Sequence, residues 1–362
     1  MSTRKKRIVY LFGAGATEAV VKVIDPEKGL LTSDIRTKIE ELFARKAHVI
    51  DDLLWNELLS TTSNIEHLIS ILEYQNDFEA SHVIRGYYRS ALQDLARPFS
   101  DNPPALNLYT VLGDLHLNVD KKEELSCILT LNYEDVLEQS LVKHLGCKLN
   151  YGIEADTNSA DAQVTVLKLH GSFSWVNCRP IQTGSGSGSN PEKALWIPPG
   201  VGKHIGNYPF NLLWGKAAEC LMMAEVVRVV GCSLSHNDWG LVPLLYAAQK
   251  LSGRRPPLAI ELIDFDSVCE TISDNYRYLN FTKITQIDDV VAYHKRTFPQ
   301  ASAEDLAAEL KANFSDSAKG NPFSAWLQAK IDCLVEDDEI DISTEKKFVH
   351  SFYYEDGSHE KA

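Results

Sequence analysis

A histidine and an asparagine each follow an apolar run in this sequence, and both side chains could take part in catalysis. His170 comes directly after the largely apolar run Val164–Leu169 and is followed by Gly171, which can open a turn. A histidine at the end of a strand can act as a general acid or base near neutral pH, or it can be a satisfied residue of the core. Asn132 follows the run Cys127–Thr130 and offers both a hydrogen-bond donor and an acceptor.

A glycine-rich turn near the N-terminus could receive a phosphate. Gly13, Ala14 and Gly15 follow the β-type run Ile8–Phe12 and precede a helical pattern. Glycines let the backbone approach a ligand closely, and a helix N-terminus supplies unpaired N–H groups, so this turn could hold a pyrophosphate. The third glycine of the dinucleotide fingerprint is absent, and a simple tight turn is the alternative interpretation.

Hydroxyl and carboxylate side chains surround Asn132 at its strand-to-helix junction. Thr130, Glu134 and Asp135 could bind sugar hydroxyls or cap the helix that follows. Capping alone would explain Asp135, because aspartate is a preferred N-cap residue, but capping does not require Asn132.

Two later strand-like runs also end in small or polar residues. Gly231 and Ser233 follow the run Val226–Val230, and Asp266 follows the run Leu258–Ile263. A carboxylate in such a position can bind ribose hydroxyls. These residues therefore join the candidates for a ligand site.

The elements that must position these residues alternate between strand-like and helical patterns, which predicts an α/β fold. This alternation is typical of a parallel sheet with helices on both faces. Right-handed crossovers would bring the carboxyl ends of the strands to one edge, where ligands bind in open α/β sheets. We therefore expect the candidate residues to meet at that edge.

A helical insertion interrupts this alternation at about residues 30–120. It contains a capping box at Ser63–Glu66 and a helix from Ser81 to Leu95, which we expect to end before Pro98. The insertion has no catalytic cluster, so we expect it to form a lid or a partner surface.

The C-terminal segment, residues 296–362, contains two more helical patterns. The first begins at Ser302, and the second carries Phe323 and Trp326. We therefore divide the chain into a core domain at 1–295 and a C-terminal segment that could form an oligomer or partner surface.

Composition and charge narrow the class of protein. The chain has 362 residues, 44% of them hydrophobic, and a net charge of −14. No apolar run approaches the ~20 residues of a membrane span, and no signal-peptide pattern is present, so we expect a cytoplasmic protein. The negative charge argues against direct nucleic-acid binding. The seven cysteines include no CxxC pair, which argues against a disulfide framework and a four-cysteine zinc site.

Four segments, in this order along the chain, resemble the motifs of the sirtuin-like family. They are the phosphate loop Gly13–Gly15, a TxNxD-like segment at Thr130–Glu134, a histidine segment at Lys168–Ser172 and a G-x-S loop at Gly231–Leu234. Glu134 stands where the family usually has aspartate. The resemblance covers about residues 7–290 and implies a Rossmann-like fold that binds NAD+.

The resemblance extends to one branch of this family. Protein-deacylating sirtuins carry a zinc module built on paired cysteines after the histidine, and this chain has only isolated cysteines there. The helical insertion, the Asn132–Tyr133 pair and Trp175 resemble the prokaryotic branch associated with anti-phage defence, whose members degrade NAD+. The resemblance therefore implies an NAD+ hydrolase that needs no metal.

The resemblance also implies roles for individual residues. His170 would act as the general base, and Asn132 would orient the attacking water or the nicotinamide ribose. Gly13, Ala14 and Gly15 would hold the pyrophosphate. Further phosphate or adenosine contacts would come from Thr17, Ser233 and Asp266.

An NAD+ hydrolase must be restrained in its own cell, so we expect assembly or a partner to control it. A homo-oligomer is expected, and the resemblance suggests a DNA-translocating ATPase or an Argonaute-like protein as partner. Two alternatives remain: a non-catalytic sensor of NAD+ or ADP-ribose, and an NAD+-dependent protein deacylase. A dehydrogenase fits less well, because the dinucleotide fingerprint is incomplete.

Overall fold

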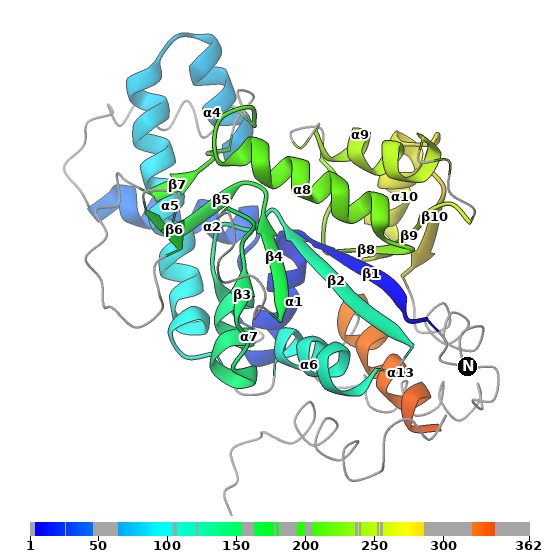
Figure 1. Ribbon diagram of the computed structural model, residues 1–362. Helices are drawn as coiled ribbons and strands as arrows, with labels where there is room; N and C mark the ends of the chain where they lie inside the picture. Colours follow the sequence, from blue (N-terminus) through cyan, green and yellow to red (C-terminus); the bar gives the residue numbers. More distant parts are fainter. Residues whose placement is uncertain are drawn as a thin grey trace, which may run out of the picture.

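The computed structural model describes residues 4–25, 27–45, 64–103, 107–120, 122–153, 163–176, 179–180, 194–199, 205–235, 238, 240–251, 253, 256–285 and 321–336. In this part of the chain, a seven-stranded parallel sheet is flanked by helices on both faces, which confirms the predicted α/β, Rossmann-like fold (Figure 1). Among the described helices, none combines the length and the apolar character that crossing a bilayer would require. The helix predicted from Ser302 lies outside the described residues.

The strands of the sheet lie in the order β10-β9-β8-β1-β2-β4-β3. Their bounds are β1 Lys6–Phe12, β2 Glu123–Thr130, β3 Leu149–Asn150, β4 Val164–Lys168, β8 Val226–Val230, β9 Ala259–Ile263 and β10 Phe281–Ile284. From β1 the chain builds outward through β2 to β4, and then returns to β8 on the other side of β1. Without the short edge strand β3 this is the Rossmann order, in which a ligand binds at the carboxyl ends where the order reverses. Here that point lies between β1 and β8.

The central strand β1 shows why the apolar runs form a sheet that is buried on both faces. Ile8, Tyr10 and Phe12 face one hydrophobic core, whereas Val9 and Leu11 face the other. The first core is packed by α1 (Ala14–Ile24), α6 (Leu108–Asp114), α7 (Val136–Leu145) and α13 (Pro322–Glu336); the second is packed by α8 (Phe210–Met223), α9 (Leu241–Tyr246) and α10 (Asp266–Asn275). A strand covered on both faces has no polar side, which explains its continuous apolar sequence.

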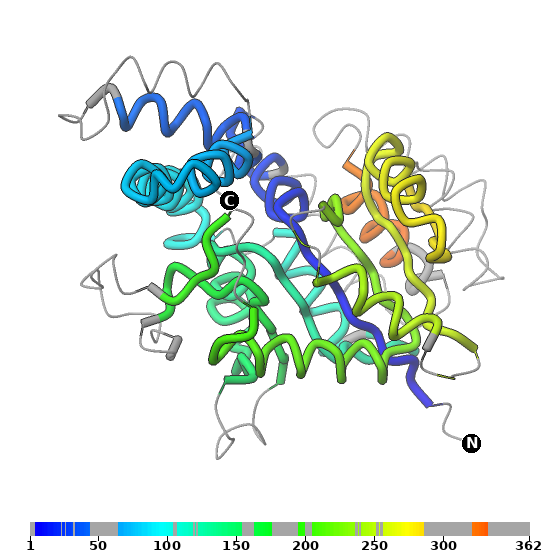
Figure 2. The backbone as a smooth tube through the Cα atoms, turned by 90° about the horizontal axis from the view of Figure 1, so that it is seen from above, coloured from blue at the N-terminus to red at the C-terminus, as the bar shows by residue number. Residues whose placement is uncertain are grey.

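The described part of the insertion is helical and contributes α2 (Thr32–Arg45), α4 (Ile65–Tyr74) and α5 (Phe78–Asp101) to the first core. Figure 2 shows these helices, coloured blue to cyan, gathered at one side of the molecule next to α1. Asn64 caps α4 by accepting a hydrogen bond from the backbone N–H of Glu66. The predicted end before Pro98 is wrong, because α5 continues to Asp101. Phe99, beyond the proline, is 4% exposed, and its burial holds the last turn in place despite the missing N–H group.

A small antiparallel sheet follows β4 directly. It consists of β5 (Gly171–Val176), β6 (Arg179–Pro180) and β7 (Ala194–Trp196), in the order β6-β5-β7. Gly171 begins this sheet with a φ of 76°, and a Cβ atom there would lie 2.3 Å from the carbonyl oxygen of Leu195. The turn at His170–Gly171 therefore requires glycine.

Candidate functional site

Backbone hydrogen bonds continue beyond the carboxyl ends of β1, β2, β4 and β8 and hold the loops that follow them together. The N–H group of Leu131 donates to the carbonyl oxygen of Phe12 at 3.1 Å, and that of Leu169 donates to Thr130 at 2.9 Å. On the other side, the N–H group of Gly13 donates to Val230 at 3.1 Å. The segments that carry Asn132 and His170 therefore lie next to each other at the predicted edge of the sheet.

Three glycines allow the loops after β1 and β8 to pack backbone against backbone. A Cβ atom on Gly13 would lie 2.5 Å from the carbonyl oxygen of Gly231, and one on Gly231 would lie 2.0 Å from the nitrogen of Ala16. The N–H group of Gly15 donates to Gly231 at 2.8 Å. The N–H groups of Gly13 and Gly15 are thus engaged with the β8 segment, while Ala14, the first residue of α1, is exposed.

Asn132 has a defined amide orientation. Its Nδ2 group donates to the carbonyl oxygen of Gly13 at 3.0 Å and to Oγ1 of Thr17 at 2.9 Å. Both amide hydrogens are therefore used inside the protein, and Oδ1 is left to act as an acceptor. A partly exposed asparagine held in this way can accept a hydrogen bond from a water molecule or a ribose hydroxyl.

The hydroxyl of Thr17 is what holds this amide. Thr17 Oγ1 donates its single hydrogen to Glu134 Oε1 at 2.7 Å. The hydroxyl of Tyr109, at 2.8 Å from Thr17 Oγ1, must therefore donate to it. Thr17 is 1% exposed and Glu134 is 7% exposed. This geometry favours a supporting role for both residues over the direct ligand contacts expected from the sequence.

A buried lysine lies beneath this network. Lys168, which is 0% exposed, donates to the backbone carbonyl of Glu134 and pairs with Glu138 Oε1 at 2.6 Å. Burial raises the pKa of Glu134, and it raises the pKa of Glu138 to about 7. The fully buried ammonium group of Lys168 thus helps to hold the backbone of the segment that carries Asn132.

Thr130 and Asp135 complete the turn around Asn132. Thr130 Oγ1 accepts a hydrogen bond from the backbone N–H of Asn132 at 3.1 Å. Asp135 occupies the N-cap position of α7, but its side chain makes no capping hydrogen bond. Instead, Glu134 Oε2 accepts from the N–H group of Val136 at 3.2 Å, and Asp135 Oδ2 accepts from Gln139 at 3.3 Å. The capping interpretation thus applies to Glu134 more than to Asp135.

His170 faces the carboxylate of Asp238, which is not among the site residues expected from the sequence. His170 is 3% exposed, and its Nε2 atom lies 3.5 Å from Oδ1 of Asp238. Asp238 Oδ2 in turn accepts a hydrogen bond from Ser235 Oγ at 3.3 Å. Both residues belong to the segment after β8, where the sequence shows several polar residues in a row but no signal that selects one. A carboxylate in this position can orient the imidazole and stabilise its protonated form.

Aromatic rings enclose the histidine. The ring of Tyr133, the neighbour of Asn132, stacks on His170 at 6.1 Å between centroids, and Trp214 lies at 6.4 Å. Phe173 also stacks on Tyr133, at 5.2 Å between centroids, and Tyr88 of α5 contacts Tyr133 edge-on at 6.3 Å. The insertion therefore forms part of the wall around the candidate site.

Two other predicted contact residues lie on the surface. Ser233 and Asp266 are exposed, and Asp266 Oδ1 accepts a hydrogen bond from Thr285 at 3.3 Å. Asp266 is the first residue of α10, a helix that is not among the elements expected from the sequence. Within the described residues, neither side chain forms a hydrogen bond or ion pair with Asn132 or His170.

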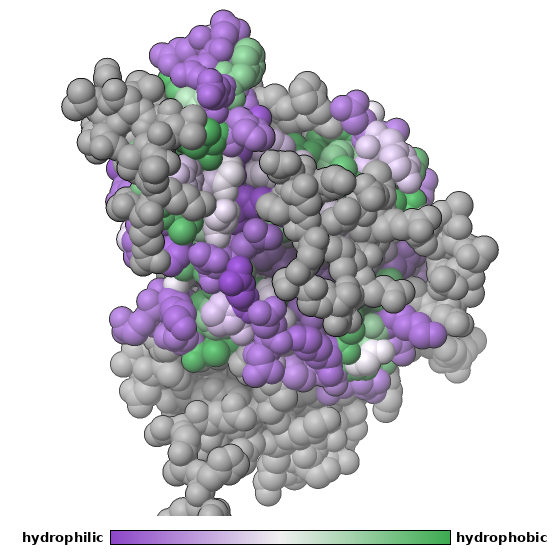
Figure 3. All heavy atoms as spheres, turned by 90° about the vertical axis from the view of Figure 1, so that its left-hand side faces the viewer, coloured by the Kyte–Doolittle hydropathy of each residue, from purple (hydrophilic) through white to green (hydrophobic). Residues whose placement is uncertain are grey.

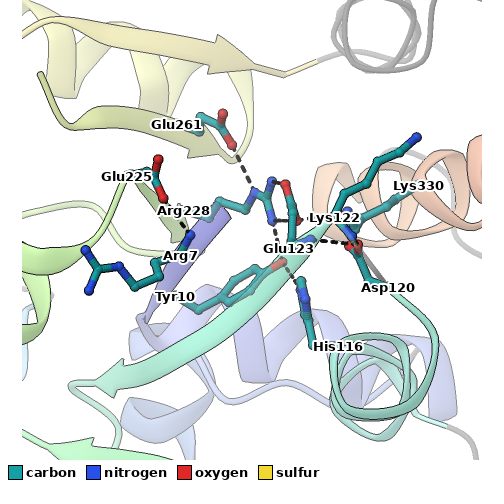
Figure 4. Close-up of polar contacts among 10 residues, drawn as sticks. All are labelled: Arg7, Tyr10, His116, Asp120, Lys122, Glu123, Glu225, Arg228, Glu261 and Lys330. Carbon is teal, nitrogen blue, oxygen red and sulfur yellow. Dashed lines mark hydrogen bonds and ion pairs between the residues drawn. The ribbon is translucent and has the colours of Figure 1, made fainter. Parts of the chain in front are cut away.

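A group of possible metal ligands lies at the opposite end of β2. The ligand atoms of His116, Asp120 and Glu123 lie within 4.8 Å of one another, and Figure 4 shows cationic side chains among them. Lys330 Nζ lies 2.7 Å from Asp120 Oδ2 and 2.9 Å from Glu123 Oε2, and Arg228 lies 2.7 Å from Glu123 Oε1. The carboxylates are therefore already paired with cations, and the cluster is a structural one.

No family model matches the sequence, and no curated protein matches it either. Function must therefore be inferred from the fold, from the geometry of the site and from the motifs described above.

Proposed function

We propose that this chain is an NAD+ hydrolase that cleaves the bond between nicotinamide and ribose. The observation that carries the proposal is the placement of Asn132 and His170 after adjacent strands, at the carboxyl edge of a Rossmann-ordered sheet. Asn132 is held with its acceptor oxygen available, and His170 lies next to a carboxylate. This edge is where dinucleotides bind in such sheets.

The proposed reaction uses these residues to place and deprotonate water. The C–N bond between ribose and nicotinamide breaks, its electron pair leaves with nicotinamide, and positive charge develops on the sugar ring. Asn132 accepts a hydrogen bond from the attacking water or a ribose hydroxyl and so orients it. His170 takes the proton from water as the new C–O bond forms, and Asp238 stabilises the resulting imidazolium. The products are nicotinamide and ADP-ribose.

The surroundings of His170 suit this role. Tyr133 and Trp214 flank the imidazole and limit its contact with solvent. Burial raises the pKa of Tyr133 well above its usual range, so its hydroxyl stays neutral. Electrostatic interactions between imidazole, carboxylate and the developing cation are stronger in such an enclosed environment.

We further propose that the activity serves anti-phage defence in the bacterial cytoplasm, where NAD+ depletion would stop an infected cell. The resemblance to the defence-associated branch of sirtuin-like proteins supports this role, and a homo-oligomer or a partner protein would control the activity. On the face seen in Figure 3, hydrophilic residues make up most of the coloured surface. The contact points we expect are Tyr74, the last residue of α4, and Phe78, the first residue of α5, which are 75% and 63% exposed.

The test is an NAD+ turnover assay that quantifies nicotinamide and ADP-ribose, with and without candidate partners. His170→Ala should lower the rate by about 10²-fold or more, because it removes the general base. His82→Ala, at an exposed position on α5, is the matched control and should retain the wild-type rate. Equal turnover by His170→Ala would contradict the proposal, and tight NAD+ binding without turnover would identify a sensor instead.

A further inference from the structure

Two arginines on α5 lie one helical turn apart but differ in their partners. Burial lowers the pKa of both Arg85 and Arg89. Arg85 pairs with the carboxylate of Glu73. Arg89 is only 7% exposed, and in the described part of the chain no carboxylate pairs with it.

Among the described residues, Arg89 finds few acceptors for its donors. Its Nη2 group lies 3.5 Å from the backbone carbonyl of Phe173, at the outer limit of a hydrogen bond. Its guanidinium carbon lies 5.4 Å from the centre of the Phe173 ring. The Nε group is buried and finds no acceptor among the described residues.

A buried guanidinium without an anion is unfavourable, because transferring a charge out of water is costly unless the charge is paired. A cation–π contact offsets only part of this cost. The planar fork of an arginine matches phosphate and carboxylate oxygens in a bidentate geometry. The guanidinium of Arg89 is therefore suited to bind an anion. No carboxylate of the described residues serves as that anion.

The position of Arg89 links it to the candidate site. Phe173, which the guanidinium covers, stacks on Tyr133, and Tyr133 stacks on His170. The loop after β1 uses the N–H groups of Gly13 and Gly15 for contacts with the β8 segment. A phosphate-bearing ligand would therefore need a cation from another element, and α5 supplies one beside the aromatic wall.

We propose that Arg89 binds a phosphate group. The phosphate is either that of the dinucleotide bound at His170 or that of a separate phosphate ligand. Anion binding by Arg89 does not require that the chain hydrolyse NAD+; only the first of these two sources rests on the proposed function.

The test measures pyrophosphate and ADP-ribose binding to the full chain by calorimetry, together with the unfolding temperature at constant ionic strength. Wild-type protein should gain stability with pyrophosphate, because a ligand that binds only the folded state stabilises it. Arg89→Met should lose this gain and bind pyrophosphate about tenfold more weakly or worse, since a charge-assisted contact is lost. Arg97→Met, on the same helix with a side chain that is 64% exposed, is the matched control and should behave as wild type.

Two further measurements distinguish anion binding by Arg89 from a purely structural role of its side chain. Without any anion, Arg89→Met should be at least as stable as wild type, because it removes a buried charge that no carboxylate of the described residues pairs with. Arg89→Lys keeps the charge without the fork and should bind pyrophosphate with intermediate affinity. The proposal is overturned if wild-type protein shows no gain with pyrophosphate, if Arg89→Met keeps the gain, or if Arg89→Met is destabilised without anion.

Competition identifies the source of the phosphate. If ADP-ribose displaces pyrophosphate, Arg89 binds the phosphate of the dinucleotide; if both bind together, it binds a separate ligand. The same titrations on His170→Ala show anion binding without turnover, so that a failure of the proposed hydrolase reaction would be distinguishable from a failure of anion binding.

Discussion

At the scale of single residues, the orientation of one amide decides what the site can do. Asn132 donates both of its amide hydrogens to protein groups, so only its oxygen can meet a ligand. The orientation depends on Thr17, whose own hydrogen goes to Glu134. The buried hydroxyl of Thr17 thus determines which atom of the more exposed Asn132 amide faces a ligand.

Thr17→Val tests this dependence with a side chain of nearly the same shape. We expect kcat for NAD+ hydrolysis to fall about tenfold or more while KM changes little, because the amide loses one of the two acceptors that fix its orientation. The free energy of unfolding should fall by about 1–3 kcal/mol, since buried partners of the hydroxyl lose a hydrogen bond. Thr17→Ser keeps the hydroxyl and should retain most of the activity. Wild-type kcat in a folded Thr17→Val protein would refute the dependence.

Asp238→Asn tests whether the carboxylate acts through His170. Removing the negative charge should lower kcat by about 10²-fold, because the imidazolium formed during the reaction loses its partner. Binding of ADP-ribose should change little, and the pH profile of kcat should shift relative to wild type. Asp274→Asn is the matched control, because the side chain of Asp274 is 72% exposed. An unchanged pH profile in Asp238→Asn would show that the carboxylate has no role in proton transfer.

At the scale of elements, the contact between the loops after β1 and β8 holds the two halves of the sheet together at the site. Gly231 has a φ of 55°, and a Cβ atom on it would meet backbone atoms of Gly15 and Ala16 that cannot move aside. The contact therefore depends on the absence of a side chain at this position.

Gly231→Ala should lower the free energy of unfolding by about 2–5 kcal/mol through strain and steric overlap. Gly86→Ala provides the comparison, because Gly86 lies exposed in α5 and a Cβ atom there would contact nothing within 4 Å. That substitution should stabilise the protein by about 0.5–1 kcal/mol. Urea denaturation of both variants measures the difference, and equal stabilities would contradict this account of the loop contact.

The elements also show what could be predicted from the sequence. Apolar runs that end in polar residues predicted the main strands of the parallel sheet and the placement of Asn132 and His170 at one edge. The roles of Asp238 and Thr17 could not be predicted, because each depends on a contact between segments far apart in the chain. Pro98 was misinterpreted because local propensity favoured a helix end, whereas the burial of Phe99 extends the helix.

At the scale of the whole molecule, a buried charged cluster joins strands β2, β8 and β9 to helix α13. Arg228 of β8 pairs with Glu123 of β2 and Glu261 of β9, and Lys330 of α13 pairs with Asp120 and Glu123. Burial alone would raise the pKa of Glu123, but Arg228 and Lys330 outweigh burial and lower it well below its usual range. At pH values above the pKa that Glu123 has in the unfolded chain, its carboxylate therefore stabilises the fold. This contribution is lost as the pH falls through the lower pKa of the folded state.

Lys330→Met should lower the free energy of unfolding at neutral pH by about 3–5 kcal/mol, because it leaves buried carboxylates short of a cation. Part of the loss should disappear in acid, where the carboxylates are protonated in the unfolded chain. Lys283→Met, at an exposed position on β10, should change stability by only about 0.5 kcal/mol. Chemical denaturation at neutral and acidic pH measures the stability of both variants. A Lys330→Met protein as stable as wild type would contradict the role of the ion pairs between Lys330 and the carboxylates of Asp120 and Glu123.

The same helix has a consequence for how the protein is synthesised. Trp326 covers the guanidinium of Arg228 at 4.6 Å, and Lys330 completes the charge balance at the start of β2. A nascent chain on the ribosome exposes β1, β2 and the catalytic candidates long before residues 322–336 emerge. The charge balance around Glu123 can therefore be completed only after residues 322–336 have left the ribosome, well after the strands that carry the other charges.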